Sequence, residues 1–268
     1  MNKYLLLSAI LILSQIFTMA QTVTIVDHVW TAKNLDVATF SNGDPIPQAK
    51  TNESWQEAGE NMEPAWCYYE NNPANGTKYG KLYNWWAVID TRGLAPVGWH
   101  IPSAIEMITL GDYGTYGIPS PLKNKTGWNT YKWETGGEER ELCPKCKNWS
   151  DEYKRKVACH LCKDTRWIDI KKKPVVKHSV NGGSNNTGFS ALPGGARNCD
   201  GTFDNIGYSA FFWTTDNDIS EDSRYKTEDY LNRKIIKAFS KQLSYNTDNL
   251  VGAMYNKCIG MSIRCVKN

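Results

Sequence analysis

The chain has no strong excess of charge of either sign. Its 268 residues carry 31 Lys and Arg against 28 Asp and Glu, which gives a formal net charge of +3. Nucleic-acid-binding domains are usually far more basic, because they neutralise a row of phosphates. We therefore expect no nucleic-acid partner.

Familiar catalytic motifs are missing as well. The sequence contains no phosphate-binding loop and no dinucleotide fingerprint. The segment Gly188-Phe-Ser-Ala-Leu192 differs from the G-x-S-x-G elbow of hydrolases. There are four histidines, and His100 is interpreted as a packed or hydrogen-bonded structural residue rather than a base. With no recognisable acid, base and nucleophile set, the sequence predicts a protein that is not an enzyme.

Long apolar runs are absent except near the N-terminus. Lys3 precedes the apolar stretch Leu5–Phe17, and small residues at Thr18 and Ala20 follow, as in a cleaved export signal. The stretch is too short for a membrane span, and no cysteine follows it that could carry a lipid. We expect residues 1–20 to be a signal peptide cleaved after Ala20, and the mature protein to be secreted, periplasmic or at the cell surface. The alternative is a retained anchor helix.

Two helices are predicted from their N-terminal caps. Residues 51–59 form a short helix that Thr51 or Ser54 can cap. Ser103-Ala-Ile-Glu106 is a capping box, in which the hydroxyl and the carboxylate each satisfy a backbone amide. Apolar residues then continue at helical spacing, which predicts a helix over residues 104–113.

The other local signals are turns and short strands. Residues 71–76 read as a turn-dense loop, and residues 79–89 should be buried, either as helix or as strand. Strands are expected at Phe211–Trp213, at Lys234–Ser240 and at Ser262–Val266. Few helices, many short strands and long loops predict an α+β fold.

Four of the eight cysteines form two close pairs, Cys143-Pro-Lys-Cys146 and Cys159-His-Leu-Cys162, which twelve residues separate. This spacing is typical of a structural zinc site in which four thiolates complete a tetrahedron and leave no open position. Because exported cysteines tend to oxidise, two disulfides are the main alternative. A thioredoxin-like redox role is a third, but neither pair lies in a βαβ setting.

These four cysteines belong to a basic insertion, residues 137–178. From Glu138 to His178 there are twelve Lys and Arg against seven Asp and Glu, so the remainder of the chain is slightly acidic. The run Lys171-Lys-Lys-Pro174 is either a solvated linker or a contact for acidic polysaccharide, lipid headgroups or nucleic acid.

A series of motifs identifies a family. In order they are Val29–Leu35, Tyr79–Trp86, Gly98–Ser103, Gly188–Gly195, Phe212–Thr215 and Gly260–Val266. The series resembles the Fibrobacter succinogenes major paralogous domain, a family of exported bacterial proteins with no settled activity. The resemblance implies a C-type lectin-like domain over residues 21–268, which the insertion at 137–178 interrupts.

The resemblance also bears on the remaining cysteines. Family members with P-A-W-C-Y-Y, here Pro64–Tyr69, carry a second cysteine in the terminal R-C-V motif. This implies a disulfide between Cys67 and Cys265, and it leaves Cys199 and Cys258 as a second pair. Both bridges would stabilise the fold by closing long loops.

A lectin-like fold further implies a possible calcium-dependent sugar site. Sugar-binding members use E-P-N or Q-P-D followed by W-N-D, and this chain has neither; Trp213–Asn217 only loosely resembles the second motif. The nearby carboxylates could hold Ca²⁺ or could form a solvated acidic loop. They are Asp216, Asp218, Glu221 and Asp222.

These observations predict an exported, non-catalytic binding module that recognises cell-surface or matrix glycans. The 11 Trp and 14 Tyr offer flat amphipathic faces of the kind that bind sugars, although core packing also accounts for such a content. One alternative is a structural or adhesion protein that binds cell-surface proteins through the Cys-rich insertion. Another is an enzyme of unrecognised type.

Overall fold

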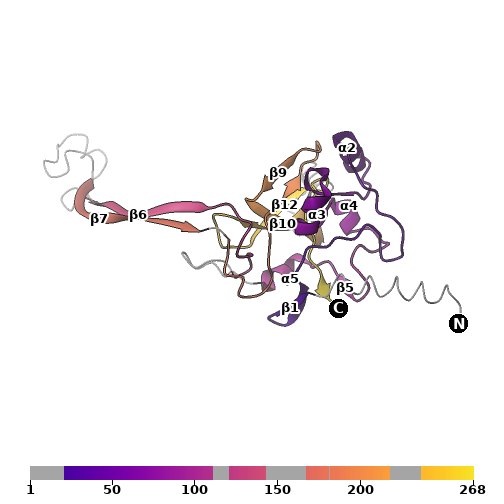
Figure 1. Ribbon diagram of the computed structural model, residues 1–268, viewed down its shortest axis with the longest axis horizontal. Helices are drawn as coiled ribbons and strands as arrows, with labels where there is room; N and C mark the ends of the chain where they lie inside the picture. The colour runs from indigo at the N-terminus through magenta and orange to yellow at the C-terminus, as the bar shows by residue number, and fades with distance from the viewer. Residues whose placement is uncertain (1–20, 111–120, 143–166, 181, 218–236) are drawn as a thin grey trace, which may run out of the picture. The chain divides into compact units, whose positions relative to one another are not determined.

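The computed structural model describes residues 21–110, 121–142, 167–180, 182–217 and 237–268, with mostly backbone alone in 131–142 and 167–180. It divides the chain into two compact units. Unit 1 comprises residues 1–130 and 181–268, and unit 2 is Tyr131–Val180, which contains the insertion expected at 137–178. The fold is α+β with mostly strands, as predicted (Figure 1).

A four-stranded sheet joins the two ends of unit 1. Its order is β1-β2-β13-β5, and all of its neighbours are antiparallel. Val266 pairs with Trp30 on one side and with His100 on the other, so the last strand lies next to the N-terminal hairpin. The strands are β1 (Thr22–Ile25), β2 (His28–Thr31), β5 (Trp99–His100) and β13 (Val266–Lys267).

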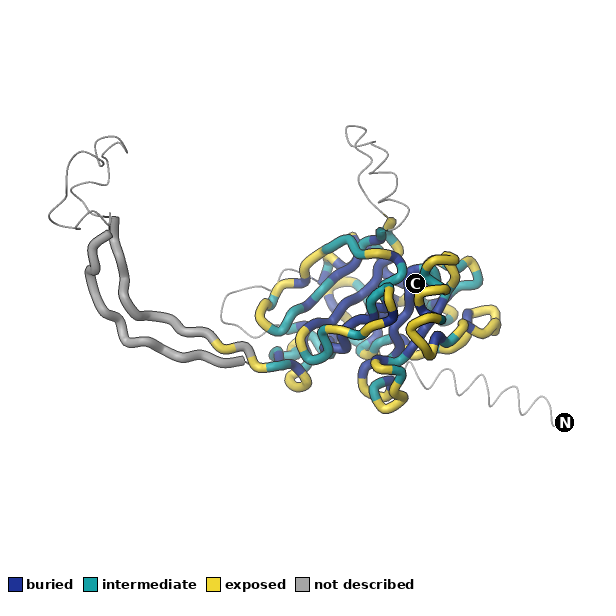
Figure 2. Tube along the Cα trace, turned by 90° about the horizontal axis from the view of Figure 1, so that it is seen from above, coloured by how far each residue is buried: buried dark blue, intermediate teal, exposed yellow. Residues whose placement is uncertain are grey.

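A five-stranded sheet carries the core of unit 1. Its order is β12-β11-β10-β8-β9; the pairing of β10 with β8 is parallel and the others are antiparallel. Successive residues of β10 alternate between two hydrophobic clusters: Phe211 and Trp213 pack in one, Ala210 and Phe212 in the other. Figure 2 shows the buried positions running through the interior of the unit. The strands are β8 (Gly194–Arg197), β9 (Phe203–Ile206), β10 (Ser209–Asn217), β11 (Lys237–Ser244) and β12 (Val251–Asn256).

The predicted capping box at Ser103 is present, and a second one is found at Thr51, where a simple cap by Thr51 or Ser54 was expected. Thr51 and Ser54 cap α2 reciprocally, and Ser103 and Glu106 do the same for α5. Helix α5 ends at Thr109, and residues 111–113 of the expected helix lie outside the described residues. The helices are α2 (Asn52–Glu60), α3 (Pro73–Tyr79), α4 (Trp85–Val88) and α5 (Ala104–Thr109), with a 3₁₀ turn, η1 (Tyr69–Asn71). None of the described helices is long and apolar enough to cross a membrane.

The expected loop at residues 71–76 is partly helical instead. Asn72 accepts a hydrogen bond from the amide of Ala74, and Pro73 occupies the first helical position, where its missing amide costs nothing. The ambiguous stretch at residues 79–89 contains both element types. It holds β4 (Leu82–Tyr83), which pairs with β3 (Trp66–Cys67), and then α4.

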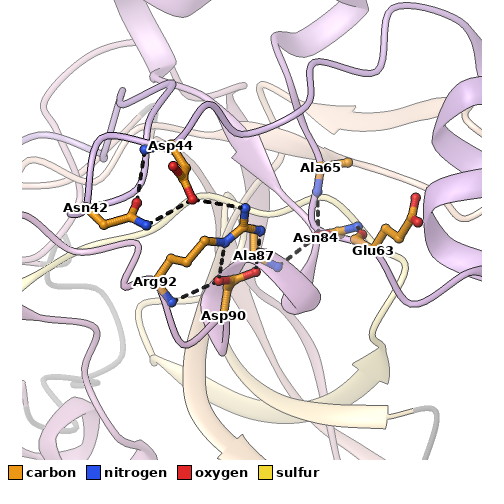
Figure 3. A network of polar contacts seen from close by, with 8 residues as sticks. All are labelled: Asn42, Asp44, Glu63, Ala65, Asn84, Ala87, Asp90 and Arg92. Carbon is orange, nitrogen blue, oxygen red and sulfur yellow. Dashed lines mark hydrogen bonds and ion pairs between the residues drawn. The ribbon is translucent and has the colours of Figure 1, made fainter.

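Asn84 separates β4 from α4 and satisfies three backbone groups. Its Oδ1 accepts from the amides of Ala65 (3.0 Å) and Ala87 (3.1 Å), and its Nδ2 donates to the carbonyl of Glu63 at 2.7 Å (Figure 3). Asn84 thus caps α4 and ties the start of the helix to residues 63–65.

Unit 2 is a two-stranded antiparallel ribbon of β6 (Tyr131–Leu142) and β7 (Trp167–Val180). The register sets Lys171 opposite Glu139, Lys172 opposite Glu138 and Lys177 opposite Glu134. Two of the three lysines of the run 171–173 therefore stand opposite glutamates in the register, and Lys173 stands opposite Gly137. An isolated two-stranded ribbon is only marginally stable in water, so this unit needs further stabilisation.

A buried guanidinium group holds the C-terminal segment in unit 1. Arg264 donates to the carbonyls of Thr31 and Phe189, both at 2.7 Å, and to Oδ1 of Asn34 at 2.7 Å. Its guanidinium carbon lies 4.5 Å from the centre of the Phe189 ring. Burial lowers the pKa of Arg264 to about 9, so the group stays charged at neutral pH.

Replacing Arg264 by Met should destabilise the protein by about 3 kcal/mol or more, because at least two buried carbonyls would lose their donors. The matched control is Arg92→Met. Arg92 pairs with Asp90 and Asp44 at the surface (Figure 3), and exposed pairs of this kind contribute little to stability. Urea unfolding of both variants measures the two losses. Equal losses would contradict the role given to Arg264.

Candidate functional site

A pocket of about 350 Å³ opens on unit 1 where three distant segments meet. Its lining residues are Gln56, Gly59, Glu60, Cys199, Asp200 and Cys258. The first three come from the last turns of α2, and the others come from the loops after β8 and β12. The size lies at the small end of the range for ligand pockets, which is about 300–1,000 Å³.

The Cys199–Cys258 disulfide forms one wall of this pocket and confirms the second predicted pair. It joins residues that are 59 apart in sequence, with their Cα atoms 5.0 Å apart. A Cβ on Gly59 would lie 2.8 Å from the Cβ of Cys258, so only glycine lets α2 approach the bridge this closely. The wall is therefore close-packed and apolar.

The polar groups of the pocket are hydrogen-bond acceptors. Gln56 donates through Nε2 to Oε1 of Glu60 at 2.7 Å, which leaves its own Oε1 as an acceptor. Asp200 accepts from the hydroxyl of Thr202 at 2.7 Å and from the Thr202 amide at 3.0 Å. These bonds hold the pKa of Asp200 below its usual range, so its carboxylate is ionised at neutral pH.

The predicted Cys67–Cys265 disulfide is wrong. Both cysteines are free and fully buried. They lie in different hydrophobic clusters, Cys67 with Trp55 and Leu82, and Cys265 with Met261. Burial raises the pKa of each thiol to about 12, which keeps both protonated and unreactive.

The predicted metal ligands fall largely outside the described residues. This holds for Cys143, Cys146, Cys159 and Cys162 of the zinc prediction, and for Asp218, Glu221 and Asp222 of the calcium prediction. The remaining carboxylate, Asp216, accepts from the amide of Ala104 at the start of α5. Within the described part of the chain, no three His, Cys, Asp or Glu side chains are grouped as metal ligands.

His100 is fixed through both of its ring nitrogens. Nε2 lies 2.7 Å from Oε1 of Glu106, and Nδ1 lies 2.7 Å from Oδ1 of Asn268. The other oxygen of Glu106 accepts from the amide and the hydroxyl of Ser103. Since two acceptors hold the ring, neither nitrogen is left to take a proton from a substrate. The expected structural role of His100 agrees with this geometry.

The environment of this pair shifts both pKa values. Desolvation of the ring opposes its charged form, but the hydrogen bonds to Glu106 and Asn268 outweigh it and raise the pKa of His100. Desolvation likewise opposes ionisation of Glu106, but the bonds from Ser103 and His100 outweigh it and lower the pKa of that carboxyl. The ion pair thus links β5, α5 and the C-terminal residue.

Sequence reasoning did not single out the polar residues of the pocket. Gln56, Glu60 and Asp200 belong to no recognisable motif, and they are far apart in the chain. The available signal was the Cys199–Cys258 pair, because a disulfide brings its flanking loops together. The helix that supplies Gln56 and Glu60 was predicted, but its contact with the Cys199–Cys258 disulfide was not.

Comparison with known proteins assigns the chain to a family. The model of the Fibrobacter succinogenes major domain matches residues 23–267, and the chain belongs to this family. No curated protein and no solved structure matches it.

The His100–Glu106 pair should make stability depend on pH. The raised pKa of His100 means that its contribution is complete below about pH 6.5 and is lost as the pH rises through the folded-state value. The lowered pKa of Glu106 means that its contribution is lost as the pH falls below about 4. Because the pair is partly exposed, the difference in unfolding free energy between the wild type and His100→Gln should be below about 1 kcal/mol. This difference should shrink as the pH rises from 6 to 8. A difference that is constant over this range in urea titrations contradicts the pairing.

Proposed function

We propose that the protein is a non-catalytic binding module of C-type lectin-like architecture that recognises glycans outside the cytoplasm. The observation that carries the proposal is the pocket beside the Cys199–Cys258 bridge. Its acceptors, Gln56, Glu60 and Asp200, are the kind of groups that bind sugar hydroxyls. The proposed ligand is a glycan of the cell surface or matrix.

Features of the fold support a lectin-like architecture. The ends of the domain pair through β2 and β13, and the elements between them are short strands connected by long loops. Loops on a stable scaffold are where recognition sites are usually found. The N-terminal sequence supports export, and the Cys199–Cys258 disulfide suits an oxidising compartment.

The contacts of the reactive side chains favour binding over catalysis. His100 is held through both ring nitrogens, and the thiols of Cys67 and Cys265 are protonated in the core. None of these residues lines the pocket. A binding role requires only the acceptors that the pocket has.

A glycan array, screened with calcium and again with a chelator, should give at least one binding oligosaccharide. Replacing Gln56 by Trp should reduce that binding by about tenfold or more, because a bulky ring would fill the pocket mouth and remove one acceptor. Lys33→Trp, at an exposed position outside the pocket, is the control and should bind normally. Binding that persists in Gln56→Trp would place the sugar site elsewhere, and an array with no binder would refute the function.

We also propose that the Cys-rich insertion is a zinc-stabilised contact surface for a cell-surface protein. Support comes from the ribbon: β6 and β7 stay paired as far as Leu142 and Trp167, the residues on either side of segment 143–166. A two-stranded ribbon gains little stability from its own packing. A closed four-thiolate zinc site at its end would supply the missing stabilisation.

Native mass spectrometry of the exported protein should therefore find one Zn²⁺ with Cys143, Cys146, Cys159 and Cys162 unoxidised. Alkylation under denaturing conditions counts the free thiols, and the Cys199–Cys258 bridge serves as the internal control for oxidation. Chelation should release the metal and make the insertion sensitive to protease while unit 1 stays folded. A metal-free protein in which these four cysteines are oxidised would contradict the zinc site and favour two disulfides.

A further inference from the structure

The charged side chains that line the pocket described above are all acidic. Its two ionisable side chains are the carboxylates of Glu60 and Asp200, and none of its described lining residues is basic. The other walls are the disulfide and Gly59, which are apolar. A ligand that enters the pocket therefore meets negative charge beside an apolar wall.

The end of α2 adds to this field. Gln56, Gly59 and Glu60 lie in the last turns of this nine-residue helix, and the last turn contains no basic residue. The C-terminus of a helix carries a partial negative charge, which Lys, Arg or His usually offsets. No side chain of that turn offsets the partial charge, although the amides of Asn61, Met62 and Glu63 donate to its carbonyls.

We propose that the pocket binds the ammonium group of an amine-bearing sugar, of the kind found in glycans with de-N-acetylated hexosamine units. This inference rests on the glycan-binding function proposed above and names the ligand class. The ammonium lies between the carboxylates of Glu60 and Asp200, and the ring hydroxyls donate to the amide oxygen of Gln56. The apolar face of the ring covers the disulfide.

A lysine side chain of a protein ligand would neutralise the same carboxylates but would donate to fewer of the acceptors in the pocket. Its ammonium is the sole donor group on an aliphatic stem, whereas an amino sugar carries hydroxyls on the neighbouring carbons. The pocket offers acceptors on both α2 and the loop at Asp200. This distribution favours a ring with several donors over a single cationic tip.

The test compares a glucosamine tetramer with its N-acetylated counterpart, which has the same rings without the charge. Isothermal titration with the full-length protein at low salt should show the glucosamine oligomer binding about five- to tenfold more tightly, as two exposed ionic contacts allow. The preference should decline towards 1 M salt, where the screening length is about 3 Å.

Two double variants identify the carboxylates responsible. Glu60→Gln with Asp200→Asn keeps the size and one acceptor oxygen of both side chains, and it should abolish the preference without loss of thermal stability. Glu57→Gln with Asp204→Asn is the matched control, because it removes the same net charge at exposed positions outside the pocket. The control should keep the preference.

Each result separates the inference from the function on which it rests. Equal binding of both oligomers, or equal loss in both double variants, overturns the inference while glycan binding stands. Binding of a lysine-rich peptide without either oligomer overturns the sugar assignment and indicates a protein ligand. If neither oligomer nor any glycan on the array binds, the proposed function falls and the inference falls with it.

Discussion

The walls of the pocket depend on one buried guanidinium group. Arg197 donates to the carbonyls of Ala49 and Thr51, both at 2.8 Å, and to that of Gly201 at 3.0 Å. Ala49 and Thr51 precede α2, and Gly201 follows Asp200, so a single side chain fixes the start of the helix relative to the opposite loop. Long loops contain carbonyls that no strand or helix can satisfy, and a five-donor fork satisfies several of them at once.

The burial of cations also accounts for part of the aromatic content of the chain. Arg197 lies over the rings of Trp55 and Phe203, both at 4.8 Å, and Lys81 lies 4.6 Å from the centre of the Trp66 ring. A cation over an aromatic face recovers part of the solvation that it loses on burial. These rings therefore belong to the core and do not form an exposed sugar platform. The case for a glycan ligand rests on the acceptors of the pocket and not on aromatic content.

Local features of the fold could be predicted from the sequence, and non-local ones could not. The capping box at Ser103 and a cap at Thr51 or Ser54 were predicted because the residues of such a cap lie within four positions of one another. The prediction of a loop at residues 71–76 was wrong because Asn and Gly in this segment favour turns, whereas Pro73 also suits the first position of a helix. The Cys67–Cys265 bridge failed because a family pattern shows which cysteines occur together, not which core cluster each one enters.

The polar residues of the pocket escaped prediction for a related reason. Glu60 and Asp200 form a site only because Arg197 and the Cys199–Cys258 bridge bring their segments together, and nothing in the spacing of the sequence shows that contact. The same two constraints tie both segments to one another. Weak, exposed charge contacts can give useful selectivity when the protein loses little conformational entropy on binding. A close-packed wall of disulfide and glycine is thus consistent with a small binding pocket whose selectivity comes from charge.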